Sequence, residues 1–172
     1  MRQLILALPL ILAACAQAAN APVGAGAARM QAKADLVPAR LAGDWHEIAG
    51  FYDPAESGCS IGLSRIAPEG RDLRVTLSDC AGLGSPRLVA EQTSGPGHYL
   101  VRGAGRLTGP WWVLWTDPEY RALVIASPRG EFGGIFSRTP RMPAGLYLAA
   151  RRALTVAGFD MAQLRPDLRS PS

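Results

Sequence analysis

The sequence predicts an all-β domain of eight antiparallel strands followed by one α-helix, and three observations support this fold class. First, 19 glycines and 14 prolines lie between short apolar runs, as in proteins with many tight turns. Second, the apolar runs recur about every ten residues, which is typical of a β-meander folded as a sandwich or a closed barrel. Third, beyond residue 140 the apolar spacing changes to that of a helix.

The strand candidates are rich in β-branched or aromatic residues and are bounded by turn residues. They span 45–52, 60–66, 73–78, 87–92, 98–105, 111–116, 120–127 and 132–138. The third shows the alternation of a strand with one solvated face, because Leu73, Val75 and Leu77 point to one side and polar residues to the other. Antiparallel pairing of successive strands follows from the short connections.

The segment "PAGLYLAARRALTVAGF" predicts an amphipathic helix packed on the outside of the strands. Pro143 suits its first turn, and Gly158 suits its end. The apolar stripe comprises Tyr147, Ala150, Leu154 and Ala157. A further short strand is expected at 159–164.

Length and composition favour one globular domain, because 172 residues with 48% hydrophobic content can bury a core. The formal net charge is +4, but the arginines are scattered among 14 acidic residues, and only Arg151 and Arg152 are adjacent. We therefore expect a solvated surface of mixed charge and no nucleic-acid partner, with weak attraction to anionic lipid surfaces left open. The expected oligomeric state is a monomer or weak dimer.

The N-terminal stretch "MRQLILALPLILAACAQ" predicts export. One arginine precedes an apolar run that is shorter than the roughly 20 residues needed to span a bilayer, as in a secretory signal. Cleavage after "AQA" would release a soluble periplasmic or secreted protein. The sequence "LAAC" resembles the lipobox of bacterial lipoproteins and is the favoured alternative, in which Cys15 becomes the lipidated, palmitate-bearing N-terminus. Ala16 resembles the pattern that directs such proteins to the outer membrane, facing the periplasm.

The chain then divides into four parts. A lipoprotein-type signal peptide is expected at 1–14, a lipidated N-terminus with a flexible tether at 15–38, the folded domain at 39–165 and a disordered tail at 166–172. The tether assignment rests on its Ala-, Gly- and Gln-rich composition without apolar periodicity.

Cys59 and Cys80 are expected to form a disulfide. An even cysteine count in an oxidising compartment favours pairing. The two residues flank strand candidates that are joined through "APEGRD", so a hairpin would bring the sulfurs within reach. The alternative is a reactive thiol at Cys59, for which only His46 and His98 are available as bases.

Three motifs resemble those of the lipocalin family and occur in the family's order. "GDWHEIAGF" contains the G-x-W of the first, "WWVLWTDPEYRALVIASP" contains the T-D-x-x-Y of the second, and "IFSRTP" contains the arginine of the third. The match covers about residues 41 to 164 and is most similar to bacterial outer-membrane lipocalins. The residues that carry it are Gly43, Trp45, Thr116, Asp117, Tyr120 and Arg138.

The resemblance implies an eight-stranded, up-and-down barrel of the calycin type with the helix outside. It also implies that these motif residues seal the closed end of the barrel, with Arg138 stacked on Trp45, and that they do not contact ligand. His46 and the cysteine pair depart from the family pattern, and Gly133 and Gly134 are expected to widen the cavity or admit a bend.

An eight-stranded barrel holds at most a small ligand, and strand parity identifies the side chains that face it. The candidates are apolar, which favours a fatty acid or a lysophospholipid. They are Leu73, Val75, Leu77, Tyr99, Val101, Trp111, Val113, Trp115, Gly134 and Phe136.

The expected function is therefore binding or transport of a small hydrophobic ligand at the bacterial cell envelope, without catalysis, cofactor or metal. No nucleophile elbow, phosphate loop or metal-spaced cluster occurs in the sequence. The alternatives are a structural or stress-related envelope protein with a filled barrel, and a lipid-modifying enzyme that uses a cavity thiol or carboxylate. Glu47 would be a candidate acid only if it were buried and unpaired.

Overall fold

The computed structural model describes residues 30–52, 61–78, 86–103 and 105–168. The predicted signal peptide, the lipidation site at Cys15 and the predicted pair Cys59 and Cys80 lie outside these ranges.

The described residues contain ten strands in one antiparallel sheet, two more than the eight expected. The expected first strand, 45–52, corresponds to β2, and a separate short strand β1 precedes it. Trp45 lies between the two and donates its backbone N–H to the Ser64 carbonyl at 2.9 Å, while the residues after it pair with β9. The strands are β1 (Gly43–Asp44), β2 (His46–Gly50), β3 (Leu63–Glu69), β4 (Asp72–Leu77), β5 (Arg87–Gln92), β6 (His98–Val101), β7 (Gly109–Thr116), β8 (Ala122–Ala126), β9 (Gly133–Ser137) and β10 (Arg165–Pro166).

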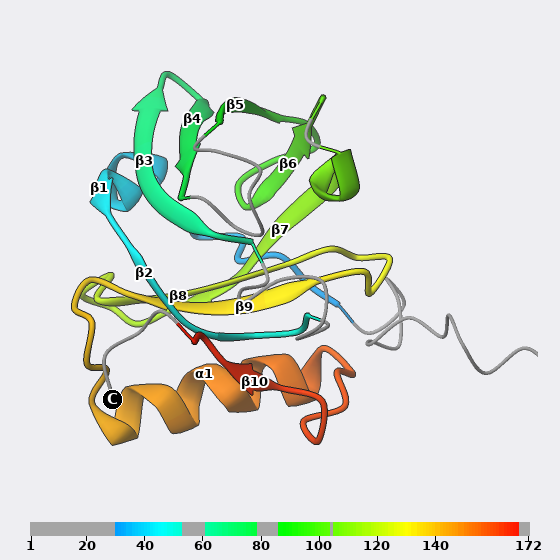
Figure 1. Cartoon of the computed structure of the whole chain (residues 1–172). Helices are drawn as coiled ribbons and strands as arrows, with labels where there is room; N and C mark the ends of the chain where they lie inside the picture. Colours follow the sequence, from blue (N-terminus) through cyan, green and yellow to red (C-terminus); the bar gives the residue numbers. More distant parts are fainter. Residues whose placement is uncertain (1–29, 53–60, 79–85, 104, 169–172) are drawn as a thin grey trace, which may run out of the picture.

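The sheet curls into a barrel (Figure 1), which decides between the sandwich and the barrel. Strands β3 to β9 pair with their neighbours in chain order, and the segment that carries β1 and β2 contacts both ends of this series. Gly43 in β1 pairs with Ile66 of β3, and His46 in β2 pairs with Ser137 of β9. One chain segment therefore bridges the two edges.

The buried carboxylate of Glu47 reinforces the seam between β2 and β3. It accepts hydrogen bonds from the backbone N–H groups of Ile61 at 3.1 Å and Gly62 at 2.7 Å. Backbone groups that would otherwise lack a strand partner are thereby satisfied.

Helix α1 (Ala144–Val156) packs outside the barrel over β7, β8 and β9, as expected (Figure 1). Ala150 and Leu154 are buried against the sheet. Pro143 occupies the N-cap, and Gly158 follows the C-cap with φ +91°, a left-handed conformation that favours glycine. The short strand expected at 159–164 lies instead at β10, where Arg165 pairs with Gly50 of β2.

Residues 30–38 pack against the barrel, although the sequence assigned them to a flexible tether. Met30 and Leu36 are buried, and Lys33 donates its backbone N–H to the Val113 carbonyl at 2.8 Å. Likewise, Asp167 in the expected tail is buried and donates its N–H to Ile48. Isolated contacts hold both segments against the barrel, and contacts of this kind leave no apolar period in the sequence.

Two short 3₁₀ helices, η2 (Pro38–Leu41) and η3 (Gly105–Leu107), lie beside tryptophans. The Trp45 indole N–H donates to the carbonyl of Leu41 at 2.9 Å, and the Trp111 indole N–H donates to that of Leu107 at 2.8 Å. Each indole thus satisfies the last carbonyl of a helix. Among the described residues, no helix is long and apolar enough to cross a bilayer.

Candidate ligand site

Trp45 and Arg138 meet at one end of the barrel, in the arrangement that the lipocalin motifs imply. The Arg138 guanidinium lies 3.8 Å from the centre of the Trp45 ring. It also donates hydrogen bonds to three backbone carbonyls, those of Tyr120 at 3.2 Å, Asp44 at 3.1 Å and Arg40 at 2.9 Å. Burial of the guanidinium lowers the pKa of Arg138. This one side chain joins four segments of the chain.

Asp117 organises the turn between β7 and β8 at the same end. Its carboxylate accepts hydrogen bonds from the backbone N–H groups of Arg121 at 2.6 Å and Ala122 at 2.8 Å, and from the Arg121 side chain at 2.7 Å. Burial would raise the pKa of Asp117, but these hydrogen bonds outweigh it and hold the pKa below its usual value. Tyr120 turns the chain with φ +57°, and its hydroxyl accepts from the Val37 N–H.

The barrel interior is a continuous apolar cluster, and most of the side chains assigned to the cavity wall lie in it. Gly134 also faces inward, since a Cβ at that position would meet Phe136 and Ile61. The buried members among the candidates are Leu73, Val75, Leu77, Tyr99, Val101, Trp111, Val113 and Phe136. Contact with a ligand stays a prediction for each of them.

Trp115 was assigned to the wrong face. A β-bulge between Val113 and Trp115 shifts the register against β8, so Leu114 and Trp115 both point outward and pack against the helix side of the sheet. A bulge inserts one unpaired residue and therefore inverts the facing of those after it. Simple alternation along the strand fails at this point.

Gly133 and Gly134 make room for phenylalanine rings, so they do not widen a cavity as expected. A Cβ on Gly133 would lie 3.1 Å from the Phe159 ring on the helix side. A Cβ on Gly134 would lie 2.7 Å from the Phe136 ring inside the barrel. The two glycines thus serve opposite faces of β9.

We expect Gly134→Ala to destabilise the protein by about 2 kcal/mol, because the Phe136 ring must leave its rotamer in a packed interior. Gly145→Ala on α1 is the control, since a Cβ there meets nothing within 4 Å. Alanine at that helical position is expected to be neutral or stabilising by up to about 1 kcal/mol. Urea denaturation measures both, and equal stability of the two variants would contradict the packing argument.

The interior contains two buried hydroxyls, of Tyr99 and Thr116, that lack a hydrogen-bond partner among the described residues. The pKa of Tyr99 is raised to about 12, mainly by burial of its hydroxyl and to a smaller extent by the electrostatic effects of Asp72 and Tyr120. The phenol therefore stays protonated and available as a donor at neutral pH. Because unsatisfied buried hydroxyls are uncommon, the Tyr99 hydroxyl is a candidate donor to a ligand. Strand alternation placed Tyr99 on the wall of the barrel interior but did not indicate that its hydroxyl would lack a partner.

The described residues offer little catalytic chemistry. Glu47 is buried, yet its carboxylate is engaged by the N–H groups at the barrel seam, so it does not meet the condition set for a candidate acid. His46 is exposed, and the His98 ring lies edge-on to Trp112 at 4.8 Å on the outside of the barrel. No group of three or more His, Cys, Asp or Glu within the described ranges could hold a metal ion.

Several interior residues were missed by sequence reasoning. Leu36 and Leu41 come from the N-terminal segment and η2, and Phe132 comes from the turn before β9, where its ring stacks edge-on against Trp111 at 5.6 Å. Strand parity does not apply outside strands. For Leu36 and Leu41 the only signal in the sequence is that each is a large apolar residue beside a turn, whereas Phe132 shares the parity of Gly134 and Phe136 in the expected strand 132–138.

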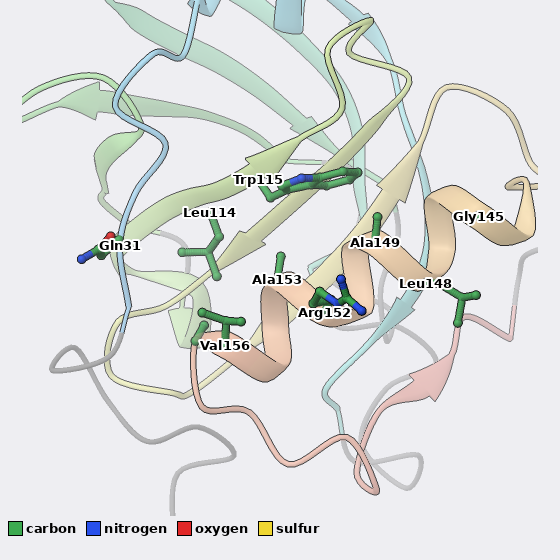
Figure 2. Close-up of a pocket in the computed structure, with 10 residues that line it drawn as sticks. Gln31, Leu114, Trp115, Gly145, Leu148, Ala149, Arg152, Ala153 and Val156 are labelled. Atoms are coloured by element: carbon green, nitrogen blue, oxygen red, sulfur yellow. The ribbon is translucent and has the colours of Figure 1, made fainter.

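A groove of about 760 Å³ lies outside the barrel between α1 and β7 (Figure 2). Leu114 and Trp115 form one wall, and Ala149, Ala153 and Val156 of α1 belong to the other. A second groove of about 590 Å³ follows the seam near His46 and Ser64.

Comparison with known proteins agrees with this architecture. Residues 97–168 match the family described as "Lipocalin-like domain". Temperature-induced lipocalin-1 of Arabidopsis thaliana is 33% identical over 58 residues, which are 34% of this chain. The matched part spans only 31% of that relative.

Solved structures match over more of the chain. Lobster apocrustacyanin A1 has a TM-score of 0.60 at 15% identity and covers 77% of this chain and 79% of its own. Apocrustacyanin C1 has a TM-score of 0.59 at 14% identity and covers 82% and 89%. The chain therefore has a lipocalin-like fold, a curled antiparallel sheet with one C-terminal helix. The family match over residues 97–168 and the two solved structures agree on this fold.

Proposed function

We propose that this protein is a lipocalin that binds a small hydrophobic ligand inside its barrel, of the fatty acid or lysophospholipid class, at a bacterial cell envelope. The apolar interior supports the hydrophobic part of the ligand, and the unpartnered Tyr99 hydroxyl supports a polar atom on it. The Tyr99 hydroxyl is the observation that carries the proposal, because a barrel filled solely for stability gains nothing from a buried donor without an acceptor.

The surroundings of Tyr99 favour one of the two ligand classes. Asp72 acts electrostatically on the Tyr99 hydroxyl and disfavours negative charge there. An ionised fatty-acid carboxylate would meet the same repulsion. A neutral acceptor, such as the ester carbonyl or hydroxyl of a lysophospholipid, fits the protonated phenol without that penalty.

Mass spectrometry of lipids that co-purify with the native protein tests the proposal directly. We expect a stoichiometric single-chain lipid. Titration of delipidated protein with lysophosphatidylcholine and with palmitate, followed by tryptophan fluorescence, should give the tighter affinity for the lysolipid. Absence of any co-purified lipid together with absence of a response to both probes would refute ligand binding.

We expect Tyr99→Phe to weaken lysolipid binding about tenfold, the equivalent of one good hydrogen bond, without destabilising the empty protein. Removing a buried hydroxyl that has no partner should leave the melting temperature unchanged or raise it. Isothermal titration and thermal melting separate the two effects. A lowered melting temperature with unchanged affinity would show that the hydroxyl is structural.

The envelope location is proposed from the signal-like N-terminus and the "LAAC" motif. Cys15 would carry the lipid anchor and hold the domain on the periplasmic side of the outer membrane. Palmitate labelling of the wild type and of Cys15→Ser in a bacterial host tests this. Label retained in the Cys15→Ser variant, or absent from the wild type, would contradict it.

A structural envelope protein with a filled barrel is the second candidate. The close approach of Gly134 to the Phe136 ring and the contact of Trp111 with Phe132 favour it, because these rings occupy interior volume. It predicts no response to either lipid probe and an unchanged melting temperature when lipid is added.

A further inference from the structure

The outward face of α1 exposes two large apolar side chains beside an arginine. Helical spacing puts Leu148 and Val156 on the side opposite the buried Ala150 and Leu154. Leu148 is 65% exposed and Val156 is 70% exposed, among the most exposed large apolar side chains of the described residues. A surface helix ordinarily presents charged side chains to water, so this face is suited to a partner that is not water.

The groove beside α1 extends this apolar surface (Figure 2). The bulge in β7 turns both Leu114 and Trp115 outward, and the small residues Ala149 and Ala153 leave the Trp115 ring only partly covered. A partly exposed tryptophan between apolar side chains is typical of residues that lie at the boundary between lipid and water.

The chain segment that contains α1 carries positive charge without acidic residues. From residue 132 to residue 159 the sequence contains four arginines and no aspartate or glutamate. Arg138 is engaged at the barrel end, whereas Arg152 lines the groove and forms no hydrogen bond or ion pair with any residue that the structure describes. Arg151 lies over Tyr147, and the nearest acid along the chain is Asp160, beyond the helix. Arginines beside exposed apolar residues match the anionic headgroups of a membrane surface.

The point where the chain enters the described domain also lies beside this face of α1. The described residues begin at Met30, which packs in the cluster under α1, and Gln31 lines the groove. The chain therefore enters the described part of the domain beside this face. An attachment point in the sequence before Met30, such as Cys15, would hold this side of the domain near the membrane.

We propose that the outer face of α1, formed by Leu148, Arg152 and Val156 with Trp115 at its edge, docks on an anionic lipid surface. The apolar side chains enter the boundary between headgroups and acyl chains, and the arginines contact lipid phosphates. This surface lies outside the barrel, so its role is independent of the ligand proposed for the interior.

The test measures contact of lipid with Trp115. Total binding of the protein to vesicles would not distinguish this face from the N-terminal segment. The full chain is mixed with vesicles of brominated phosphatidylcholine, alone or with brominated phosphatidylglycerol, and quenching of tryptophan fluorescence is measured. The quenching that disappears in Trp115→Phe is the part that comes from Trp115. We expect quenching of Trp115 that grows with phosphatidylglycerol and falls with salt. Val156→Glu should reduce it about tenfold.

Val89→Glu is the matched control, since it places the same charge on another exposed valine, 46% exposed on β5. We expect it to leave the quenching unchanged, and circular dichroism confirms that both variants fold. Equal quenching in the two variants, or in the two kinds of vesicle, would overturn the proposal. Quenching by monomeric brominated lysolipid without vesicles would instead assign the groove to a soluble amphiphile, and protection of Trp115 that depends on protein concentration would assign it to a second copy.

Discussion

Replacing Arg138 with alanine is expected to lower the free energy of unfolding by about 3 kcal/mol, because it removes a cation–π contact and several charge-assisted hydrogen bonds together. For a domain of this size the melting temperature should fall by roughly 10 °C. The loss leaves the carbonyls of Arg40, Asp44 and Tyr120 without this donor and uncovers the face of Trp45.

Ligand affinity should be largely unchanged in the folded Arg138→Ala protein, since the guanidinium lies over Trp45 at the barrel end and is not part of the interior cluster. Thermal melting and lysolipid titration on the same preparation measure both quantities. Arg141→Ala, at an exposed position just beyond, is the control. A melting temperature equal to that of the control would show that Arg138 does not hold the barrel end together.

Asp117→Asn is expected to cost about 2 kcal/mol at neutral pH, because the neutral amide cannot replace a carboxylate that accepts bonds from two backbone N–H groups and a guanidinium. The pKa of Asp117 is lowered in the folded protein. Its stabilisation is therefore complete above the usual aspartate pKa of 3.8 and is lost as the pH falls through the lower folded value.

The difference in unfolding free energy between wild type and Asp117→Asn should consequently shrink as the pH falls below 3.8. Urea denaturation from pH 7 to pH 2.5 measures it. Glu119→Gln is the control, since Glu119 is exposed and, among the described residues, pairs with the same Arg121 side chain alone. A difference that stays constant across this range would mean that the ionised carboxylate is not the stabilising form.

The residues at the barrel end were identified from their resemblance to the lipocalin motifs. The structure places the Arg138 guanidinium over Trp45 and puts Asp117 in the turn between β7 and β8, as that resemblance implies. The strand ranges and α1 were also close, since their periodicity is strong and their turns contain glycine or proline.

The residues that line the barrel interior were predicted less accurately from the sequence. Alternation placed residues such as Val75 and Val101 in the interior, but it failed for Trp115 after the bulge in β7. The bulge depends on how β7 pairs with β8, and neither strand alone encodes it visibly. Gly134 was identified as inward but misinterpreted, because its role depends on the ring of Phe136.

The sequence by itself determined the all-β class, the order of its strands and the outer helix, and its resemblance to the lipocalin motifs pointed to the residues at one end of the barrel. The class, the strand order and the helix follow from periodicity and turn residues, which act between neighbours in the chain. Only the tertiary structure decided that Trp115 faces the helix and that Tyr99 holds a buried hydroxyl without a partner among the described residues. Those properties depend on which distant segments pack against one another, and long-range packing leaves no period in the sequence.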